Sequence, residues 1–275
     1  MIARQPFTFG GVARFAHASF LRLAAVALIF GLISGIVVSW LAVTCFAPVI
    51  DEAISNLPLT GSIERGTLHW PEKDGRLLGA NAFASFSVAI NERQSEGAPV
   101  DFTFEFRTNA FVARSFPGTT ALPYPSHSEI ELNRTALFPA WGAWRAPILA
   151  GLIPATAVVL CLTWALLGVV YGLVPFLLAV MLGRDLTLRA AWKLSVAAQL
   201  PGSLMMAFAL ALYSTGKISV ILVFVMLPAH LIPTLCYLII SPFFVPKADK
   251  SSEKNNPFES ESKRRRKGKN PFAGK

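Results

Sequence analysis

The sequence predicts an α-helical polytopic membrane protein with four transmembrane helices and an inserted small antiparallel β extracytoplasmic domain. Three observations support this fold class. Apolar residues make up 53% of the chain, charged residues only 15%, and the mean hydropathy is +0.52. Long uncharged stretches stand at both ends of a polar region of about a hundred residues. Within that polar region alone, side chains alternate between apolar and polar with a period of two.

The amino terminus, residues 1–22, carries Arg4, Arg14 and Arg22 and no acid. The chain is then uncharged from Leu23 to Ile50, which is longer than the ~7–15 apolar residues of a cleaved signal. We therefore expect a signal anchor, with a cytoplasmic N-terminus and a first transmembrane helix over residues 23–46.

Small side chains recur every fourth residue in this first span, at Ala27, Gly31, Gly35 and Ser39. That spacing places them on one stripe of a helix, and small side chains let a second helix approach closely. The stripe predicts a helix-packing surface. Its partner is expected to be a helix of the same chain rather than a second copy.

Residues 47–144 are predicted to form the extracytoplasmic β-rich domain. Alternation is clearest over residues 79–91 and 100–107. Shorter candidate strands are residues 61–70, 111–116 and 129–132, separated by turn-forming clusters. A small sheet with one apolar face needs a partner surface, which the membrane or the tops of the helices could supply. The domain is also expected to bind an unknown protein partner.

The sequence of the β-rich domain gives no reason to expect an enzyme. His69, His127 and Asp101 are its main catalytic candidates, with the acids Glu129 and Glu131, and the histidines stand in no recognisable catalytic motif. The three cysteines of the chain lie in or beside apolar runs, so they predict neither a disulfide framework nor a thiolate metal site. We expect no catalytic residue, no metal and no cofactor.

Aromatic residues and an arginine stand just before the second apolar stretch, at Trp141, Trp144 and Arg145. Indole rings favour the depth of lipid headgroups because they are amphipathic. These three residues are predicted to be an interfacial anchor.

Residues 145–245 are predicted to be a three-helix membrane unit with spans near 147–182, 194–213 and 218–242. The first of these contains 37 uncharged residues from Ala146 to Leu182, and a continuous helix of that length would extend about 55 Å. It is either one long span or a hairpin turning at residues 172–175. If residues 146–182 cross the membrane once, the whole chain crosses it four times. Every strongly basic segment then lies on the same side, which satisfies the positive-inside rule. We therefore predict both termini to be cytoplasmic, in a bacterial inner membrane.

The last span contains His230 between Pro228 and Pro233, and the preceding span contains Gln199. A proline inside a helix frees a backbone carbonyl, and an ionisable side chain within a span indicates a functional site. These four residues are a candidate transport site. The alternative is that His230 donates to a carbonyl of a neighbouring helix and has only a structural role.

The segment Arg189-Ala190-Ala191-Trp192-Lys193-Leu194-Ser195 leads into Pro201 and two further spans. It follows a single span, an extracytoplasmic domain and a long span. This order of elements, together with the segment itself, resembles bacterial Yip1-like membrane proteins of unknown function. The resemblance covers residues 146–244 and leaves the β domain out. It implies a polytopic architecture and a role in membrane organisation, and no catalytic residue.

The tail, residues 246–275, is predicted to be disordered and cytoplasmic. After Pro246 it carries ten of the 25 Lys and Arg residues and four acids, so ten minus four gives this tail a charge of +6. Five consecutive cations are expected to contact anionic lipid headgroups rather than nucleic acid: Lys263, Arg264, Arg265, Arg266 and Lys267. The repeated Asn-Pro-Phe at 256–258 and 270–272 is a chance repeat or a weak docking element.

These observations favour an integral membrane protein with a non-enzymatic role in membrane or envelope organisation or assembly. The alternative is a transporter or lipid-handling component that uses the proline-broken fourth span and His230. An intramembrane hydrolase is not favoured because no Ser, His and Asp set converges in the apolar segments.

Overall fold

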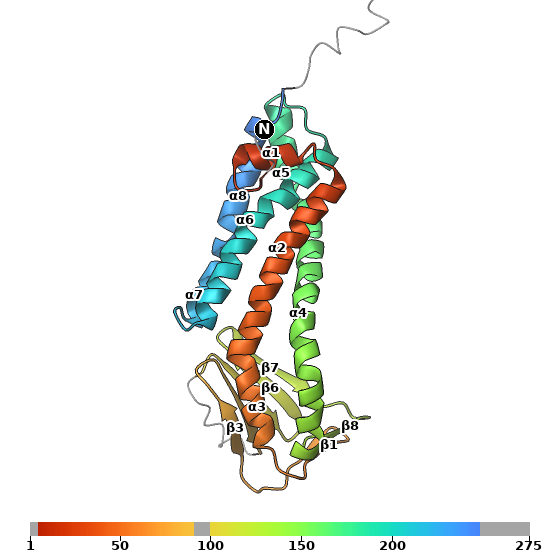
Figure 1. Cartoon of the computed structure of the whole chain (residues 1–275), viewed down its shortest axis with the longest axis vertical. Coiled ribbons are helices and arrows are strands. Elements are labelled where there is room, and N and C mark those ends of the chain that lie inside the picture. The colour runs from red at the N-terminus through yellow and green to blue at the C-terminus, as the bar shows by residue number, and fades with distance from the viewer. Residues whose placement is uncertain (1–4, 91–99, 248–275) are drawn as a thin grey trace, which may run out of the picture.

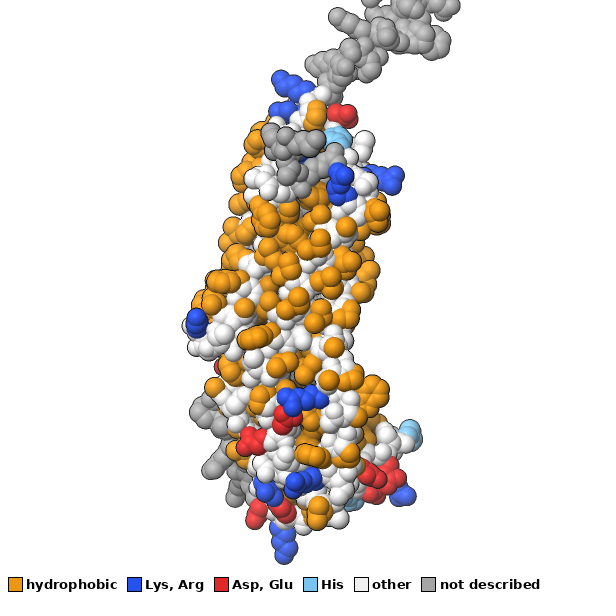
Figure 2. Space-filling model, in the orientation of Figure 1, with side chains coloured by type: hydrophobic (Ala, Val, Ile, Leu, Met, Phe, Trp, Pro, Cys, Tyr) orange, Lys and Arg blue, Asp and Glu red, His pale blue; other side chains and the backbone are white. Residues whose placement is uncertain are grey.

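The computed structural model describes residues 5–90 and 100–247. A bundle of long helices forms one end of the molecule and a β-rich unit the other (Figure 1). Four helical segments are long and apolar enough to cross a membrane: Phe20–Ser55, Arg134–Met181, Leu188–Ser214 and Val220–Phe244. The predicted number of apolar helices is confirmed. Figure 2 shows apolar side chains over the middle of the visible face and charged side chains mainly near its two ends.

The first apolar segment is longer than predicted. It comprises α2 (Phe20–Leu41), a π-helical turn (Ala42–Phe46) and α3 (Ala47–Ser55), and Ser19 caps it by accepting a hydrogen bond from the Arg22 amide. The segment before it is also folded, because α1 (Phe9–Phe15) buries Val12 and Phe15 completely. Much of the predicted cytoplasmic N-terminus therefore packs against the helical bundle.

The second apolar segment is one bent helix rather than a hairpin. Helices α4 (Arg134–Tyr171) and α5 (Leu173–Met181) meet at Gly172, which keeps right-handed helical dihedrals of φ −60° and ψ −24°. Pro175 has no amide proton to donate to the Tyr171 carbonyl, so the helical hydrogen-bond ladder is interrupted at this point. The choice of one long helix over a hairpin is confirmed.

Helix α6 (Leu188–Ser214) lies at the centre of the bundle. It packs against α2 and α4 and also against α8 (Leu231–Ile240), which follows α7 (Val220–Ala229) and precedes a 3-10 turn (Ser241–Phe244). Leu194, Ala197 and Leu200 of α6 are fully buried. The fourth helix thus contacts the rest of the bundle mainly through α6.

The β-rich unit contains two sheets. Strands β1 (Ser62–Glu64), β2 (Thr67–His69) and β8 (Glu129–Glu131) form a three-stranded antiparallel sheet in the order β2-β1-β8. A five-stranded sheet contains the remaining strands in chain order: β3 (Arg76–Ala80), β4 (Ala84–Ala89), β5 (Phe102–Arg107), β6 (Ala110–Ser115) and β7 (Gly118–Pro123).

The prediction of a wholly antiparallel domain is wrong for one pair. Strands β4 and β5 run parallel, with Ala84 opposite Phe102 and Ala89 opposite Arg107. Parallel neighbours need a long crossover connection in place of a tight turn. The alternation pattern identified these strands, but alternation is the same in both orientations.

Two strand boundaries also differ from the prediction. The expected strand over residues 79–91 is divided, because Asn81 makes a turn in which its Oδ1 accepts from the amides of Phe83 and Ala84. Strand β7 was not predicted. Its first residue, Gly118, has φ +145°, which allows a tight connection from β6, so the Pro-Gly-Thr-Thr cluster begins a strand in addition to making a turn.

Both ends of the predicted β-rich domain, residues 47–144, are helical. Residues 47–55 are α3 and residues 134–144 are the first turns of α4. Both helices extend alongside the sheets (Figure 1). Ala53 of α3 and Leu137 of α4 pack into one core with Leu78 and Val88 of the sheet. The helices supply the partner surface that the small sheet needs.

Candidate functional site

The fourth helix breaks at His230, which ends α7 and begins α8. The His230 amide still donates to the Met226 carbonyl at 2.9 Å. Pro228 and Pro233 have no amide protons, so the carbonyls of Phe224 and Ala229 lose their usual helical donors. The sequence-based expectation of a proline-broken helix around His230 is therefore confirmed.

Gly202 of α6 allows this break to lie close to the centre of the bundle. A Cβ added at Gly202 would clash with the His230 carbonyl oxygen and would lie 3.1 Å from the Thr234 hydroxyl. Only glycine permits the two backbones to approach so closely. Gly202 thus positions the broken helix against α6.

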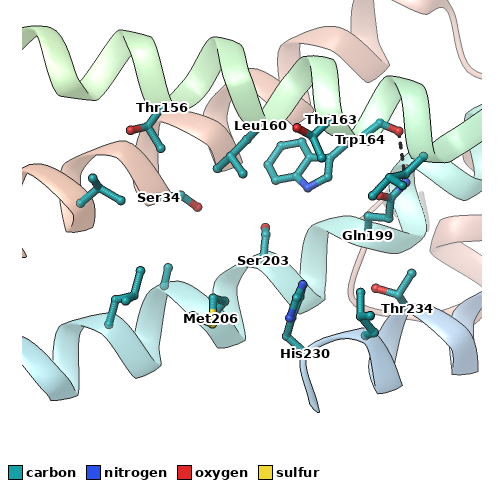
Figure 3. Close-up of a pocket in the computed structure, with 15 residues that line it drawn as sticks. Ser34, Thr156, Leu160, Thr163, Trp164, Gln199, Ser203, Met206, His230 and Thr234 are labelled. Carbon is teal, nitrogen blue, oxygen red and sulfur yellow. Dashed lines mark hydrogen bonds between the residues drawn. The ribbon is translucent and has the colours of Figure 1, made fainter. Parts of the chain in front are cut away.

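A cavity of about 220 Å³ lies where α2, α4, α6 and the α7–α8 break meet. His230 and Gln199, two of the residues predicted from sequence, both line it (Figure 3). Neither Pro228 nor Pro233 lines it, so the prolines shape the break rather than the cavity wall. Five hydroxyl side chains also line the cavity: Ser34, Thr156, Thr163, Ser203 and Thr234.

Three of the polar side chains that line the cavity, Gln199, Ser203 and Thr163, have a hydrogen-bond partner in the protein. The Gln199 amide nitrogen donates to the carbonyls of Trp164 and Ser195, both at 3.2 Å. The hydroxyl of Ser203 donates to the Leu200 carbonyl at 2.7 Å, and that of Thr163 to Val159 at 2.8 Å. These bonds fix the cavity wall and leave it little polar character.

Two buried atoms in the cavity wall have no hydrogen-bond partner in the described part of the chain, the Ser34 hydroxyl oxygen and His230 Nδ1. Ser34 is only 6% exposed. An unpaired buried polar group costs about 1–3 kcal/mol. The two atoms therefore have hydrogen-bonding capacity that the described part of the chain leaves unused.

The composition of the wall limits its chemistry. None of the residues that line the cavity is Asp, Glu, Lys or Arg. Across residues 5–90 and 100–247, no cluster of three or more His, Cys, Asp or Glu side chains could hold a metal ion. The cavity is suited to binding an uncharged, mainly apolar molecule through a few hydrogen bonds.

The predicted helix-packing stripe contacts α4 of the same chain. Cβ atoms added at Gly31 and Gly35 would meet the backbone of Ala157 and Ile153, respectively. Ser39 continues the contact by donating to the Leu149 carbonyl at 2.8 Å, and Ala27 is 5% exposed. The prediction of a partner within the chain is confirmed. Other residues of the same two helices, such as Ser34 of α2 and Thr156 of α4, line the cavity.

The predicted interfacial anchor has a different arrangement from the one expected. Trp141 Nε1 donates to Asp51 Oδ1 at 2.6 Å, and Arg145 pairs with Asp51 Oδ2 at 2.8 Å. Only Trp144 points outward, with 64% of its surface exposed. Through these two bonds to Asp51, Trp141 and Arg145 hold α4 against α3.

The β-rich unit is tied to the helices at two further points. Tyr213 of α6 donates to Asp101 at 2.8 Å. The Asn81 side-chain amide donates to the Cys45 carbonyl, in the π-helical turn, at 2.8 Å. Asp101, one of the sequence-based catalytic candidates, thus has a structural partner.

Of the remaining sequence-based candidates, His69 and Glu131 lie opposite Ser62 of β1 from the two neighbouring strands, and Glu129 and Glu131 are exposed. His69 and His127 are exposed on the β-rich unit. The cations at residues 263–267 and both Asn-Pro-Phe repeats lie outside the described residues.

Sequence reasoning missed Ser34 and Asp51. Ser34 directly precedes Gly35 of the small-residue stripe, and its signal was a hydroxyl side chain in an apolar span. Asp51 and Glu52 are the first acids after the amino terminus.

Comparison with known proteins gives no match to any protein family, any curated protein or any solved structure. The resemblance to Yip1-like proteins therefore rests on the residues quoted above, and the function is argued from the site.

Proposed function

We propose that this chain is a four-span integral membrane protein that binds a small, uncharged, mainly apolar molecule within its helical bundle, as a lipid-handling component or transporter does. The observation that carries the proposal is the cavity lined by His230, Gln199 and Ser34. Its wall is uncharged and contains two unpaired polar atoms. A site of this kind orients a ligand by hydrogen bonds and holds it by apolar contact.

The proposed placement puts both termini in the cytoplasm and the β-rich unit on the opposite side, in a bacterial inner membrane. Basic residues at the start of α2 and around the start of α6 support it: Arg22, Arg184, Arg189 and Lys193. These ends of α2 and α6 lie far from the β-rich unit (Figure 1). The cavity then lies among the membrane-spanning parts of the four helices, where a bound molecule exchanges with the bilayer.

Native mass spectrometry of the full chain, released from mild detergent, tests the binding function. We expect a retained small molecule on the wild-type protein and its loss from the Ser203→Phe variant. Ser203 bonds only to its own helix, so the substitution fills the cavity and leaves no buried partner unpaired.

The matched control is Val169→Phe, at an α4 position that is 62% exposed. This variant should retain the molecule as the wild type does. Equal occupancy in all three proteins would contradict the proposal, as would an empty wild type.

A role in membrane or envelope organisation is the second candidate. It is favoured by the junction of Asp51 with Trp141 and Arg145, which holds the β-rich unit on helices continuous with the bundle. A rigid platform of this kind suits the display of a binding surface to an unknown protein partner.

His230→Leu discriminates the two functions. A lipid-handling protein should lose ligand occupancy while the variant remains folded and inserted. A purely organising protein should assemble with its partners as before.

A further inference from the structure

Four properties of the cavity limit the class of ligand that it can bind: its charge, its size, its unpaired polar atoms and its access. This inference rests on the function proposed above. Charge is the first constraint. Because the lining contains no Asp, Glu, Lys or Arg, a ligand cation buried there would have no counter-charge, and a ligand anion would face only His230. Desolvating an unpaired ion costs several kcal/mol or more. The bound part of the ligand must therefore be uncharged.

Size is the second constraint. The cavity measures about 220 Å³, whereas an apolar cavity of about 150 Å³ holds one benzene molecule. A whole membrane lipid is much larger than this. The cavity therefore accepts one segment of a hydrocarbon chain, and the rest of such a molecule stays outside the bundle.

Polar pairing is the third constraint. The Ser34 hydroxyl can donate and accept, and His230 Nδ1 either donates or accepts according to the tautomer. Both atoms are buried without a partner, on α2 and at the α7–α8 break. An ester or hydroxyl oxygen on the chain would satisfy them without introducing charge.

Access is the fourth constraint. Helices α4 and α8 both pack on α6, and both border the cavity. Thr163 of α4 is exposed, and His230 and Leu231 on the opposite wall are partly exposed. Neighbouring α4 positions such as Leu162 and Leu166 are exposed apolar residues, 60% and 70% respectively. The cavity therefore opens sideways, toward the surface that the proposed topology places in lipid.

We infer that the occupant is one acyl chain of a glycerolipid, which enters between α4 and α8 and places its uncharged ester or hydroxyl group against Ser34 and His230. The wall binds the chain by apolar contact through residues such as Leu160 and Met206. The glycerol end of the lipid remains at the opening.

Photo-crosslinking of the full chain in phosphatidylcholine vesicles tests this inference. One vesicle set contains a trace of diacylglycerol with a diazirine in one acyl chain, and a second set contains a diazirine-bearing fatty acid, whose carboxylate is charged. Adducts are located by peptide mass spectrometry. We expect diacylglycerol adducts on α4 and α6 at Leu160 and Met206, and at least fivefold fewer from the fatty acid.

Variants separate cavity binding from lipid on the outer surface. Ser203→Phe should lower the diacylglycerol adducts at these positions at least fivefold, and Val169→Phe should leave them unchanged. Ser34→Ala combined with His230→Leu should lower them several-fold, since the ester loses both partners. Thermal unfolding of each variant in detergent establishes that it is folded.

Unchanged adducts in Ser203→Phe would overturn the inference, because the probe would then be reporting surface lipid. Cavity adducts formed mainly by the fatty acid would also overturn it, and the proposed binding function would stand. If neither probe reaches the cavity and native mass spectrometry finds it empty, both the inference and the proposed function fail.

Discussion

Asp51 accepts a hydrogen bond of 2.6 Å from the indole of Trp141. This bond connects the last part of the first apolar segment, α3, to the first turns of the second, α4. Arg145 pairs with the other carboxylate oxygen at 2.8 Å. A single side chain thus joins α3 to α4 where the β-rich unit begins.

Removing this carboxylate should loosen the junction. Asp51→Ala leaves the Trp141 donor unpaired, so we expect the free energy of unfolding to fall by about 1–3 kcal/mol. Asp51→Asn keeps an acceptor for Trp141 and loses only a partly exposed ion pair, which contributes about 1 kcal/mol or less. Thermal unfolding in detergent measures both.

The control is Glu72→Ala, which breaks a pair with Arg76 whose side chains are 44% and 45% exposed. Its effect should be smaller than that of Asp51→Ala. Equal effects of Asp51→Ala and Glu72→Ala would show that the junction has no special role in stability.

The close contact of α2 with α4 should tolerate no side chain at Gly35. A Cβ there would meet the Ile153 carbonyl, and forcing the helices apart costs about 1–3 kcal/mol. We therefore expect Gly35→Ala to lower the unfolding temperature. Gly151→Ala on α4 is the matched control, since nothing lies within 4 Å of its added Cβ. That variant should be neutral or stabilising because alanine favours helix, and a stable Gly35→Ala protein would contradict the packing described.

The β-rich unit should lose stability at alkaline pH through Tyr124. Burial raises the pKa of Tyr124 to about 12, and its hydroxyl donates to the Arg107 carbonyl at 3.0 Å. Because the folded-state pKa lies above the unfolded value, the stabilisation is complete below pH ~10 and is lost as the pH rises through the folded-state pKa. Tyr124→Phe should show a smaller loss of stability between pH ~10 and pH ~12, measured by thermal unfolding. Identical pH profiles for the two proteins would contradict this assignment.

Tyr213 should couple the bundle to the five-stranded sheet. Its hydroxyl donates to Asp101, next to β5, at 2.8 Å. We expect Tyr213→Phe to raise hydrogen exchange in β5 several-fold and to leave α2 and α4 unchanged, because a bond to a charged acceptor contributes about 1.5–3 kcal/mol. Tyr171→Phe serves as the control. Unaltered exchange in β5 would show that the sheet is held by its apolar contacts alone.

Several features were predictable because they depend on local pattern. The absence of charge identified four apolar helices, and the spacing of Gly31 and Gly35 identified the stripe that packs on α4. Prolines around His230 marked the break in the fourth helix. The alternation over residues 100–107 located β5, whose observed limits are Phe102–Arg107.

Other features depend on contacts distant in the sequence, and these were missed. The parallel pairing of β4 with β5 cannot be predicted from the alternation of apolar and polar side chains, because alternation is the same in parallel and antiparallel strands. The hydrogen bond between Trp141 and Asp51 joins residues that are 90 positions apart in the sequence. Gln199 and His230 were each identified as polar residues in apolar helices, but only the fold shows that they line one cavity with Ser34.

Site-specific labelling tests the central claim, that the four helices cross a bilayer with the cavity among them. A variant without Cys45, Cys161 and Cys236 would carry single cysteines at His127, Arg189 or Gly216, and a membrane-impermeant maleimide would be added to intact cells. We expect His127→Cys and Gly216→Cys to react from outside, and Arg189→Cys to react only after the membrane is opened. Reaction of Arg189→Cys and His127→Cys from the same side would contradict the four-span arrangement and place the cavity outside the bilayer.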